Sequence, residues 1–213
     1  MKDNVFFVSG IDTNVGKSYA TGYLAKTWNE QGVRTITQKF IQTGNVGMSE
    51  DIELHRKIMG TGLLPEDESG LTMPEIFTYP CSPHLAAEID HRPIDFDKIE
   101  KATRQLSETY DAVLLEGAGG LMVPLTRDLL TIDYVAQKNY PLIFVTSGKL
   151  GSINHTLLSL EAVTRRGIRL HTLAYNLFPE EDDDIIRRDT EAYIRDLLAK
   201  EYPETHFVIV PKL

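Results

Sequence analysis

Short apolar runs with few polar interruptions recur along the chain and alternate with segments of helical periodicity. The runs cover residues 5–8, 112–115, 142–145, 173–175 and 207–210. A strand that is buried on both faces has this continuous apolar pattern, which is typical of a parallel sheet covered by helices. Residues 34–40 are interpreted as a further strand. The pattern therefore predicts a mostly parallel β-sheet.

Helices are predicted between these strands. Apolar side chains fall on one helical face in two segments, which carry Ile153, Leu157, Leu160 and Val163, and Ile186, Tyr193, Ile194, Leu197 and Leu198. Two further helices are expected at residues 19–25 and 51–59. The alternation predicts an α/β fold with helices on both faces of the sheet and right-handed crossovers. Residues 41–80 are less regular but contain no clear linker, so we expect one domain over residues 1–213.

The charge balance is acidic, with 22 lysines and arginines against 31 aspartates and glutamates and a net charge of −9. Without a basic excess, the chain is not expected to bind nucleic acid. Cys81 is the only cysteine, which excludes an internal disulfide and favours a reducing compartment. The start of the chain is polar, and no apolar run approaches the ~20 residues that span a bilayer. We therefore expect a cytoplasmic protein that binds no membrane.

The most informative segment follows the first apolar run, where residues 10–18 read Gly-Ile-Asp-Thr-Asn-Val-Gly-Lys-Ser. A strand, a glycine-containing turn and a helix that opens with Gly-Lys-Ser form a phosphate-binding loop, which is one residue longer here than the common pattern. Free backbone N–H groups and the helix dipole attract an anion there. Lys17 can reach the β- and γ-phosphates, and Ser18 can hold Mg²⁺. This segment predicts a nucleotide-dependent enzyme.

Three other segments are expected beside this loop, because ligands of α/β sheets bind at the carboxyl ends of the strands. Glu116 directly follows one apolar run, where a carboxylate can hold Mg²⁺. Lys39, which taken alone is more simply a surface lysine, can neutralise a transferring phosphoryl group. Residues 148–155 lead into a helix, with Ser152 and Asn154 as candidate capping residues, and the N–H groups there can bind a carboxylate.

Two histidines and an acidic run are assigned no chemistry. His84 and His155 have no partner at the spacing of metal ligands or of an acid–base pair. Residues 180–184 are expected to form a solvated acidic loop that leads into a helix start. The chain also has no Gly-x-Ser-x-Gly segment and no signature of a catalytic cysteine, which leaves nucleotide chemistry as the interpretation.

Five motifs in this order resemble the dethiobiotin synthetase family. They are the phosphate loop, the segment from Lys39 to Gly44, Ser82-Pro83-His84, Glu116-Gly-Ala-Gly-Gly120 and Lys149-Leu-Gly-Ser-Ile-Asn-His155. The similarity runs from Phe6 to about Pro211. It implies a P-loop NTPase-like fold. It also implies that ATP and Mg²⁺ support closure of the ureido ring of dethiobiotin from 7,8-diaminopelargonic acid and CO₂, through a carbamate and its phosphorylated form.

The resemblance also implies roles for individual residues. Lys39 and Lys17 would be catalytic, and Ser18, Asp51 and Glu116 would surround Mg²⁺. The nucleotide would contact Thr13, Asn14, Val15, Gly16, Lys17, Ser18, Tyr19, Asp51, Glu116, Gly117, Ala118, Gly119 and, at the base, Asn176. Thr43 would contact the substrate. The substrate carboxylate would be held by the second subunit of a homodimer, through Gly151, Ser152 and Asn154.

Three features depart from the family pattern. Phe40 follows Lys39 where the family usually has proline, and Asn14 replaces an acidic residue of the loop. The chain ends at residues 211–213, where many relatives continue with a turn that contacts the base, so we expect weaker selection of adenine. Two alternatives stay open. One is a nucleotide-switched regulatory module on the same scaffold, and the other is a related P-loop synthetase that acts on another carboxylate or amine.

Overall fold

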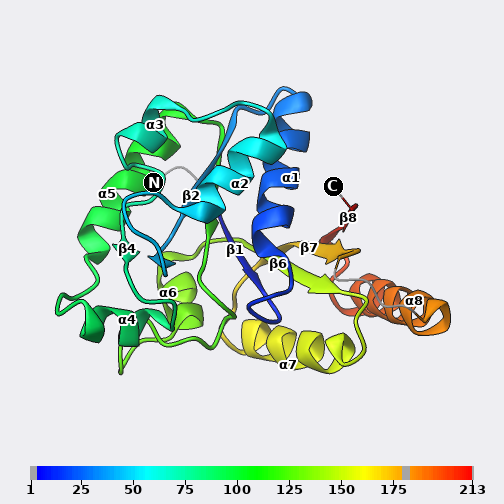
Figure 1. Ribbon diagram of the computed structural model, residues 1–213. Helices are drawn as coiled ribbons and strands as arrows, with labels where there is room; N and C mark the ends of the chain where they lie inside the picture. The colour runs from blue at the N-terminus through cyan, green and yellow to red at the C-terminus, as the bar shows by residue number, and fades with distance from the viewer. Residues whose placement is uncertain (1–3, 179–182, 213) are drawn as a thin grey trace.

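A six-stranded parallel sheet forms the centre of the computed structural model, which describes residues 4–178 and 183–212 (Figure 1). The strands lie in the order β2-β5-β1-β6-β7-β8, and neighbouring strands pair in parallel. Their bounds are Val5–Gly10 for β1, Thr35–Lys39 for β2, Ala112–Glu116 for β5, Leu142–Ser147 for β6, Leu170–Asn176 for β7 and His206–Val210 for β8. The predicted parallel sheet is confirmed, and each apolar run lies within one of its strands.

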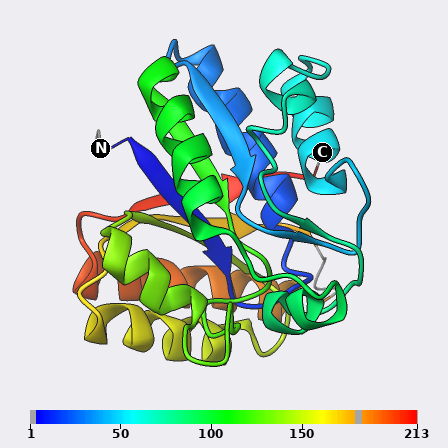
Figure 2. The ribbon, with the colours of Figure 1, turned by 90° about the vertical axis from the view of Figure 1, so that its left-hand side faces the viewer.

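Helices cover both faces of the sheet, as predicted. α1 and α2 lie on one side and α7 and α8 on the other (Figure 1 and Figure 2). Their bounds are Lys17–Glu30 for α1, Glu50–Met59 for α2, Ser152–Arg165 for α7 and Asp184–Glu201 for α8. Val8 belongs to the same buried cluster as Leu24 of α1, whereas Phe7 belongs to the cluster that contains Leu160 of α7. Successive strand residues therefore face different apolar layers, which explains the continuous apolar runs.

Within the described residues, four helices were not expected from the sequence. They are α3 (Pro65–Glu68), α4 (Pro83–Ile89), α5 (Phe96–Thr109) and α6 (Thr131–Lys138). The irregular region also contains two short strands that pair in parallel, β3 (Gln42–Thr43) and β4 (Ile76–Phe77). The start of α5 carried a readable signal, because the Asp95 side chain caps it by accepting from the backbone N–H of Lys98. No helix in the described ranges is long and apolar enough to cross a membrane.

The α8 helix buries a narrower stripe than its apolar pattern predicts. Ile194 and Leu198 are buried as expected, and Thr190 extends the same row by one turn. Tyr193, which was expected on this face, is 45% exposed. The reason is helical spacing, since Tyr193 lies beside the row of positions four residues apart that contacts the rest of the protein. That part of the predicted face is therefore wrong.

The start of α8 agrees with the expectation for the acidic run, as far as the run is described. Residues 180–182 lie outside the described part of the chain. Asp183 is the N-cap, and its Oδ1 accepts from the backbone N–H groups of Ile185 at 2.8 Å and Ile186 at 3.2 Å. These N–H groups have no partner inside the helix, so the carboxylate satisfies donors that the helix itself leaves free.

The start of α7 differs from the prediction. Ser152 and Asn154 were expected to cap this helix, but its N-cap is Gly151, which has a φ of 95° and no side-chain cap. A positive φ at this position favours glycine, because other residues meet a steric cost there. Ser152 is the first residue of the helix, and its Oγ lies 3.1 Å from Ser147 Oγ of β6. The hydroxyl therefore ties the helix to the sheet instead of capping it.

The sheet register determines which side chains meet at the carboxyl edge. Glu116, the last residue of β5, is opposite Lys39 of β2 on one side and Val8 of β1 on the other. Residues 11–16 leave β1 at the same edge and lead into α1. Because all of these strands are parallel, their ends point to the same side of the molecule, as the prediction of the site assumed.

Candidate active site

A cavity of about 460 Å³ opens at the carboxyl edge of the sheet. From the phosphate loop and the start of α1, the residues on its wall that were predicted from the sequence are Thr13, Asn14, Gly16, Lys17, Ser18 and Tyr19. From the rest of the chain, they are Lys39, Thr43, Asp51, Glu116, Ala118 and Gly119. A volume of several hundred Å³ is the usual size of a small-molecule site. The fold thus gathers most of the predicted site residues around one cavity.

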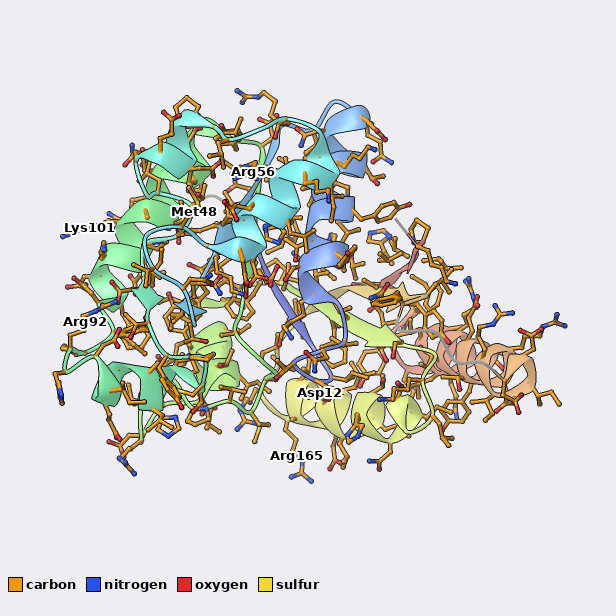
Figure 3. The ribbon with its side chains drawn as sticks, in the orientation of Figure 1. Asp12, Met48, Arg56, Arg92, Lys101 and Arg165 are labelled. Carbon is orange, nitrogen blue, oxygen red and sulfur yellow. The ribbon has the colours of Figure 1, made fainter. Side chains whose placement is uncertain are left out.

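The phosphate loop has a backbone shape that only glycine suits. Gly16 has a φ of 84°, and a Cβ placed on it would lie 2.2 Å from Nδ2 of Asn176. Lys17 is buried, and its Nζ donates to the backbone oxygens of Asp12 at 2.8 Å and Thr13 at 3.1 Å. Asp12 lies in the loop between β1 and α1 (Figure 3). Burial lowers the pKa of Lys17 to about 8, while Glu116 opposes this shift.

Three oxygen-bearing side chains predicted to surround a metal ion converge beside this loop. The Ser18 hydroxyl donates to Asp51 Oδ1 at 2.6 Å and lies 2.9 Å from Glu116 Oε1. Each group comes from a different element, namely the start of α1, the start of α2 and the end of β5. Hydroxyl and carboxylate oxygens are the ligand types that Mg²⁺ prefers, so the donor set fits this ion.

Lys39 forms the positive centre of the same cluster. Its Nζ lies 2.5 Å from Asp51 Oδ2, 2.9 Å from Glu116 Oε1 and 3.3 Å from the backbone oxygen of Gly117. Lys39 is 5% exposed and Glu116 is fully buried, so the simpler interpretation of Lys39 as a surface lysine is wrong. We call Ser18, Lys39, Asp51 and Glu116 the carboxyl-edge cluster.

Within this cluster, Lys39 and Glu116 keep each other ionised. Burial alone would raise the pKa of Glu116, but Lys39 and His55 outweigh it and hold this pKa well below its usual range. Burial alone would lower the pKa of Lys39, but Glu116 and Asp51 raise it above its usual value. A full positive charge on Lys39 thus borders the cavity at neutral pH.

Phe40 follows this lysine at the position where the family usually has proline. Its backbone N–H donates to the backbone oxygen of Glu116 at 2.8 Å, which a proline could not do. Its ring is buried against Phe7 and Tyr134, with ring centroids 5.6 Å and 4.8 Å away. The phenylalanine therefore fixes the backbone after Lys39 through a sheet hydrogen bond and packing, where a proline would fix it through its ring.

Sequence reasoning missed two buried residues on α2, His55 and Arg56. His55 Nε2 lies 2.8 Å from Glu116 Oε2, so the histidine contacts the carboxyl-edge cluster without lining the cavity. Its spacing of four residues from Asp51 on one helix was the signal that could have found it. Among the described residues, no group of three His, Cys, Asp or Glu side chains is placed to hold a metal ion.

Phe178 is the third residue that the sequence did not indicate. It lines the cavity together with Tyr19. The two rings are 6.4 Å apart between centroids and tilted by 43°, and Tyr19 is 37% and Phe178 55% exposed. Two partly exposed aromatic rings at the edge of a phosphate cavity form an apolar platform that a flat ring can cover.

Asn176, predicted at the nucleobase, lies behind the phosphate loop. It is 1% exposed, its Nδ2 donates to the backbone oxygen of Val15 at 2.9 Å, and its Oδ1 accepts from the backbone N–H of Phe178 at 3.2 Å. The amide thus connects the end of β7 to the loop. It also fixes the backbone of the aromatic residue beside the cavity.

A second cavity of about 410 Å³ adjoins the first. It shares Thr13, Thr43, Ala118 and Gly119 with the first cavity and extends to residues 80–83. Six other predicted residues are not on the wall of either cavity, namely Val15, Gly117, Asn176, Gly151, Ser152 and Asn154. Within one chain, the structure therefore brings the phosphate loop and Lys39 together but leaves the start of α7 apart from them.

Known proteins resemble this chain over nearly all of its length. The family described as an AAA domain matches residues 4–213. A protein of Pasteurella multocida named ATP-dependent dethiobiotin synthetase BioD 2 is 52% identical over 97% of this chain and 96% of its own length. A protein of Haemophilus influenzae with the same name is 56% identical over 86% of this chain and 96% of its own length. A protein of Chlorobaculum tepidum, named ATP-dependent dethiobiotin synthetase BioD, is 52% identical over 90% of this chain and 80% of its own length.

Solved structures share the fold at low sequence identity. A ParA family ATPase from Chlorobium tepidum has a TM-score of 0.54 at 12% identity, with 99% of this chain and 85% of that chain covered. Chloroplast FtsY from Physcomitrella patens has a TM-score of 0.53 at 16% identity, with 100% of this chain and 60% of that chain covered. These similarities support the P-loop NTPase-like fold and nothing more specific.

Proposed function

Because the chain belongs to the family of ATP-dependent dethiobiotin synthetases, ATP-using ligases of biotin synthesis, we propose how its residues divide the work of this reaction. The substrates are 7,8-diaminopelargonic acid, CO₂ and ATP, and the product is the ureido ring of dethiobiotin. The observation that carries the proposal is Lys39 Nζ, which lies within 3 Å of both Asp51 and Glu116 beside the phosphate loop. A buried ammonium at that place can meet both a carbamate and a phosphoryl group.

The triphosphate binds at the start of α1. Backbone N–H groups of the loop and the positive end of the helix dipole face the phosphates, and Gly16 allows their close approach. Lys17 exchanges the carbonyl oxygens of Asp12 and Thr13 for phosphate oxygens. This exchange favours the ammonium form, because an anion offsets the cost of burying the charge.

Ser18, Asp51 and Glu116 hold Mg²⁺ in this proposal. The support is the convergence of a hydroxyl and two carboxylates from three elements, at 2.6 Å and 2.9 Å from the serine oxygen. When bound, the ion would neutralise charge on the phosphates and orient them. The three side chains are held by the ends of secondary-structure elements, so their placement requires no loop rearrangement.

Lys39 acts in the two chemical steps. One amine of the substrate combines with CO₂ to give a carbamate, and a carbamate oxygen then attacks the γ-phosphorus while the bond to ADP breaks. The second amine attacks the carbonyl carbon of this mixed anhydride, loses its proton and expels inorganic phosphate. The ammonium of Lys39 stabilises the negative charge on the carbamate and on the transferring phosphoryl group.

The diamine occupies the second cavity, which adjoins the phosphate side at Thr43 and Gly119. Thr43 and the backbone near Gly117 and Gly119 contact the substrate. We propose a homodimer in which the start of α7 of the second subunit holds the substrate carboxylate. The N–H groups beside Gly151 and the exposed amide of Asn154 provide uncharged donors for that purpose.

The nucleobase stacks on the aromatic platform of Tyr19 and Phe178. The two rings line the cavity with their centroids 6.4 Å apart and their planes tilted by 43°, so a base can lie across their exposed faces. Asn176 stands behind the loop and braces it through Val15. Every nucleobase has a flat face that can stack on aromatic rings, so we expect ATP to be preferred only weakly over other nucleoside triphosphates.

The decisive assay follows ADP release at saturating Mg²⁺ and ATP, with bicarbonate present and 7,8-diaminopelargonic acid varied. Release that depends on the diamine, with one dethiobiotin formed per ADP, supports the proposal. Slow ATP hydrolysis at a rate that does not depend on the diamine would reject the proposal and favour a nucleotide-switched module. Turnover only with another amine or carboxylate would indicate a related synthetase instead.

A further inference from the structure

A chain of buried hydrogen bonds runs from α3 to the carboxyl-edge cluster. Arg56 makes a two-pronged contact with Asp67, with its Nε and Nη2 each 2.8 Å from a carboxylate oxygen. Its Nη1 donates to Thr37 Oγ1 at 2.8 Å. The same hydroxyl oxygen lies 3.0 Å from His55 Nδ1, and His55 Nε2 lies 2.8 Å from Glu116 Oε2. All five side chains are buried.

The direction of each hydrogen bond follows from the chemistry of the groups. An arginine can only donate, so the Thr37 oxygen accepts from Arg56. The single proton of the threonine hydroxyl is then directed to Nδ1 of His55. With Nδ1 accepting, the ring N–H is on Nε2, which donates to Glu116. The chain thus fixes both the tautomer and the orientation of the imidazole.

We propose that His55 is a positioning residue for Glu116. The imidazole forms a hydrogen bond with Oε2 of Glu116, and this leaves Oε1 of the same carboxylate directed to Ser18 and Lys39. Without this contact, the carboxylate would be held through Oε1 alone and could rotate about its terminal torsion, which is a soft one. This inference rests on the proposed role of Glu116 as a metal ligand. It extends that role to a histidine that does not line the cavity.

Partners that orient a metal-bound carboxylate typically change metal affinity 10–100-fold when they are removed. We therefore expect His55→Leu to weaken Mn²⁺ binding to the ADP-loaded protein by roughly 10–100-fold, as measured by electron paramagnetic resonance of free Mn²⁺. The affinity for ADP in EDTA should change by less than about 2-fold, because the phosphate loop does not touch the imidazole.

Two further variants separate positioning from general support of the fold. Glutamine can accept from Thr37 and donate to Glu116, so His55→Gln should recover most of the Mn²⁺ affinity. His206→Leu, an exposed histidine at the start of β8, is the matched control and should leave it unchanged. If His55→Leu does not fold, Thr37→Val removes the group that sets the tautomer and should shift Mn²⁺ affinity in the same direction by a smaller factor.

The proposal is overturned if His55→Leu lowers the melting temperature while Mn²⁺ affinity stays within about 2-fold of the parent, since that pattern belongs to a purely structural residue. It is also overturned if His55→Gln is as impaired as His55→Leu. These measurements use neither the diamine nor turnover. A failure of ring closure in the enzymatic assay would therefore leave their outcome interpretable.

Discussion

Two groups of buried charges lie close together around α2, and they differ in how completely their polar atoms are satisfied. In the Arg56–Asp67 pair, the carboxylate accepts two bonds from the guanidinium, one from the Thr72 hydroxyl and one from the backbone N–H of Leu64. Arg56 and Asp67 are each 1% exposed. The acceptor positions of this carboxylate are filled within the protein, so the pair has no capacity left for a ligand.

The carboxyl-edge cluster is arranged differently. One ammonium, that of Lys39, is shared between Asp51 and Glu116, and the side chains line an open cavity. Both groups incur the cost of removing charge from water, but only this one can exchange its internal contacts for bonds to phosphate or metal. The comparison teaches that incomplete satisfaction next to a cavity distinguishes a functional charge cluster from a structural ion pair.

The largest expected effect is on turnover. Lys39→Ala should lower kcat by about 10²–10³-fold, because the charge that stabilises the transferring group is lost. The affinity for ATP should fall far less, since the phosphate loop remains intact. Steady-state kinetics and calorimetry with a non-hydrolysable triphosphate measure the two quantities, with the exposed Lys26→Ala as the control. Equal losses of kcat and affinity would contradict the role given to Lys39.

The structural pair should show the opposite profile. Arg56→Met leaves Asp67 as a buried, unpaired carboxylate, which typically costs about 3–5 kcal/mol of unfolding free energy. Urea denaturation measures this loss, and Arg104→Met on the exposed side of α5 provides the control. The kcat of the folded variant should fall by much less than that of Lys39→Ala. If Arg56→Met kept its stability but lost turnover as strongly, the distinction between the two groups would fail.

A contact without charge is expected to have an intermediate effect. Phe178→Ala removes half of the aromatic platform, and base stacking on one ring is worth about 1–3 kcal/mol, or roughly 5–150-fold in affinity. Calorimetry should therefore find weaker binding of ATP and GTP alike, whereas inorganic tripolyphosphate binds as before. Phe178→Tyr should retain the affinity. If the affinity for tripolyphosphate fell equally, Phe178 would stabilise the phosphate loop and would not bind the base.

The smallest effect concerns His171, a half-buried histidine whose neighbours can carry positive charge. Burial lowers the pKa of His171 to about 4, and His206 and Arg169 add to this shift. The unfolded chain binds this proton more readily, so stability should fall as the pH is lowered from about 6.5 to about 4. His171→Phe should reduce the drop in melting temperature between pH 7 and pH 5, whereas the exposed His155→Gln should not. An unchanged drop in His171→Phe would refute the assignment.

Local sequence signals were sufficient for the elements that place the phosphate loop and the strand ends. The loop was readable because a strand, Gly16 and the start of a helix follow one another directly in the chain. Lys39 and Glu116 were readable because each ends a buried strand. Tyr193 was predicted wrongly because periodicity does not show which row of a helix contacts the sheet. The capping role of Ser152 was predicted wrongly because a serine near a helix start does not show at which residue the helix begins.

The sequence by itself determined the parallel α/β fold, the phosphate-binding loop and the family, because these depend on patterns between near neighbours in the chain. Only the tertiary structure decided that β2 lies next to β5, which places Lys39 opposite Glu116, 77 positions away in the chain. It also decided that His55 contacts that glutamate and that Phe178 joins Tyr19 at the cavity. Such contacts arise when distant segments pack together, and their energies depend on distances that no local pattern encodes.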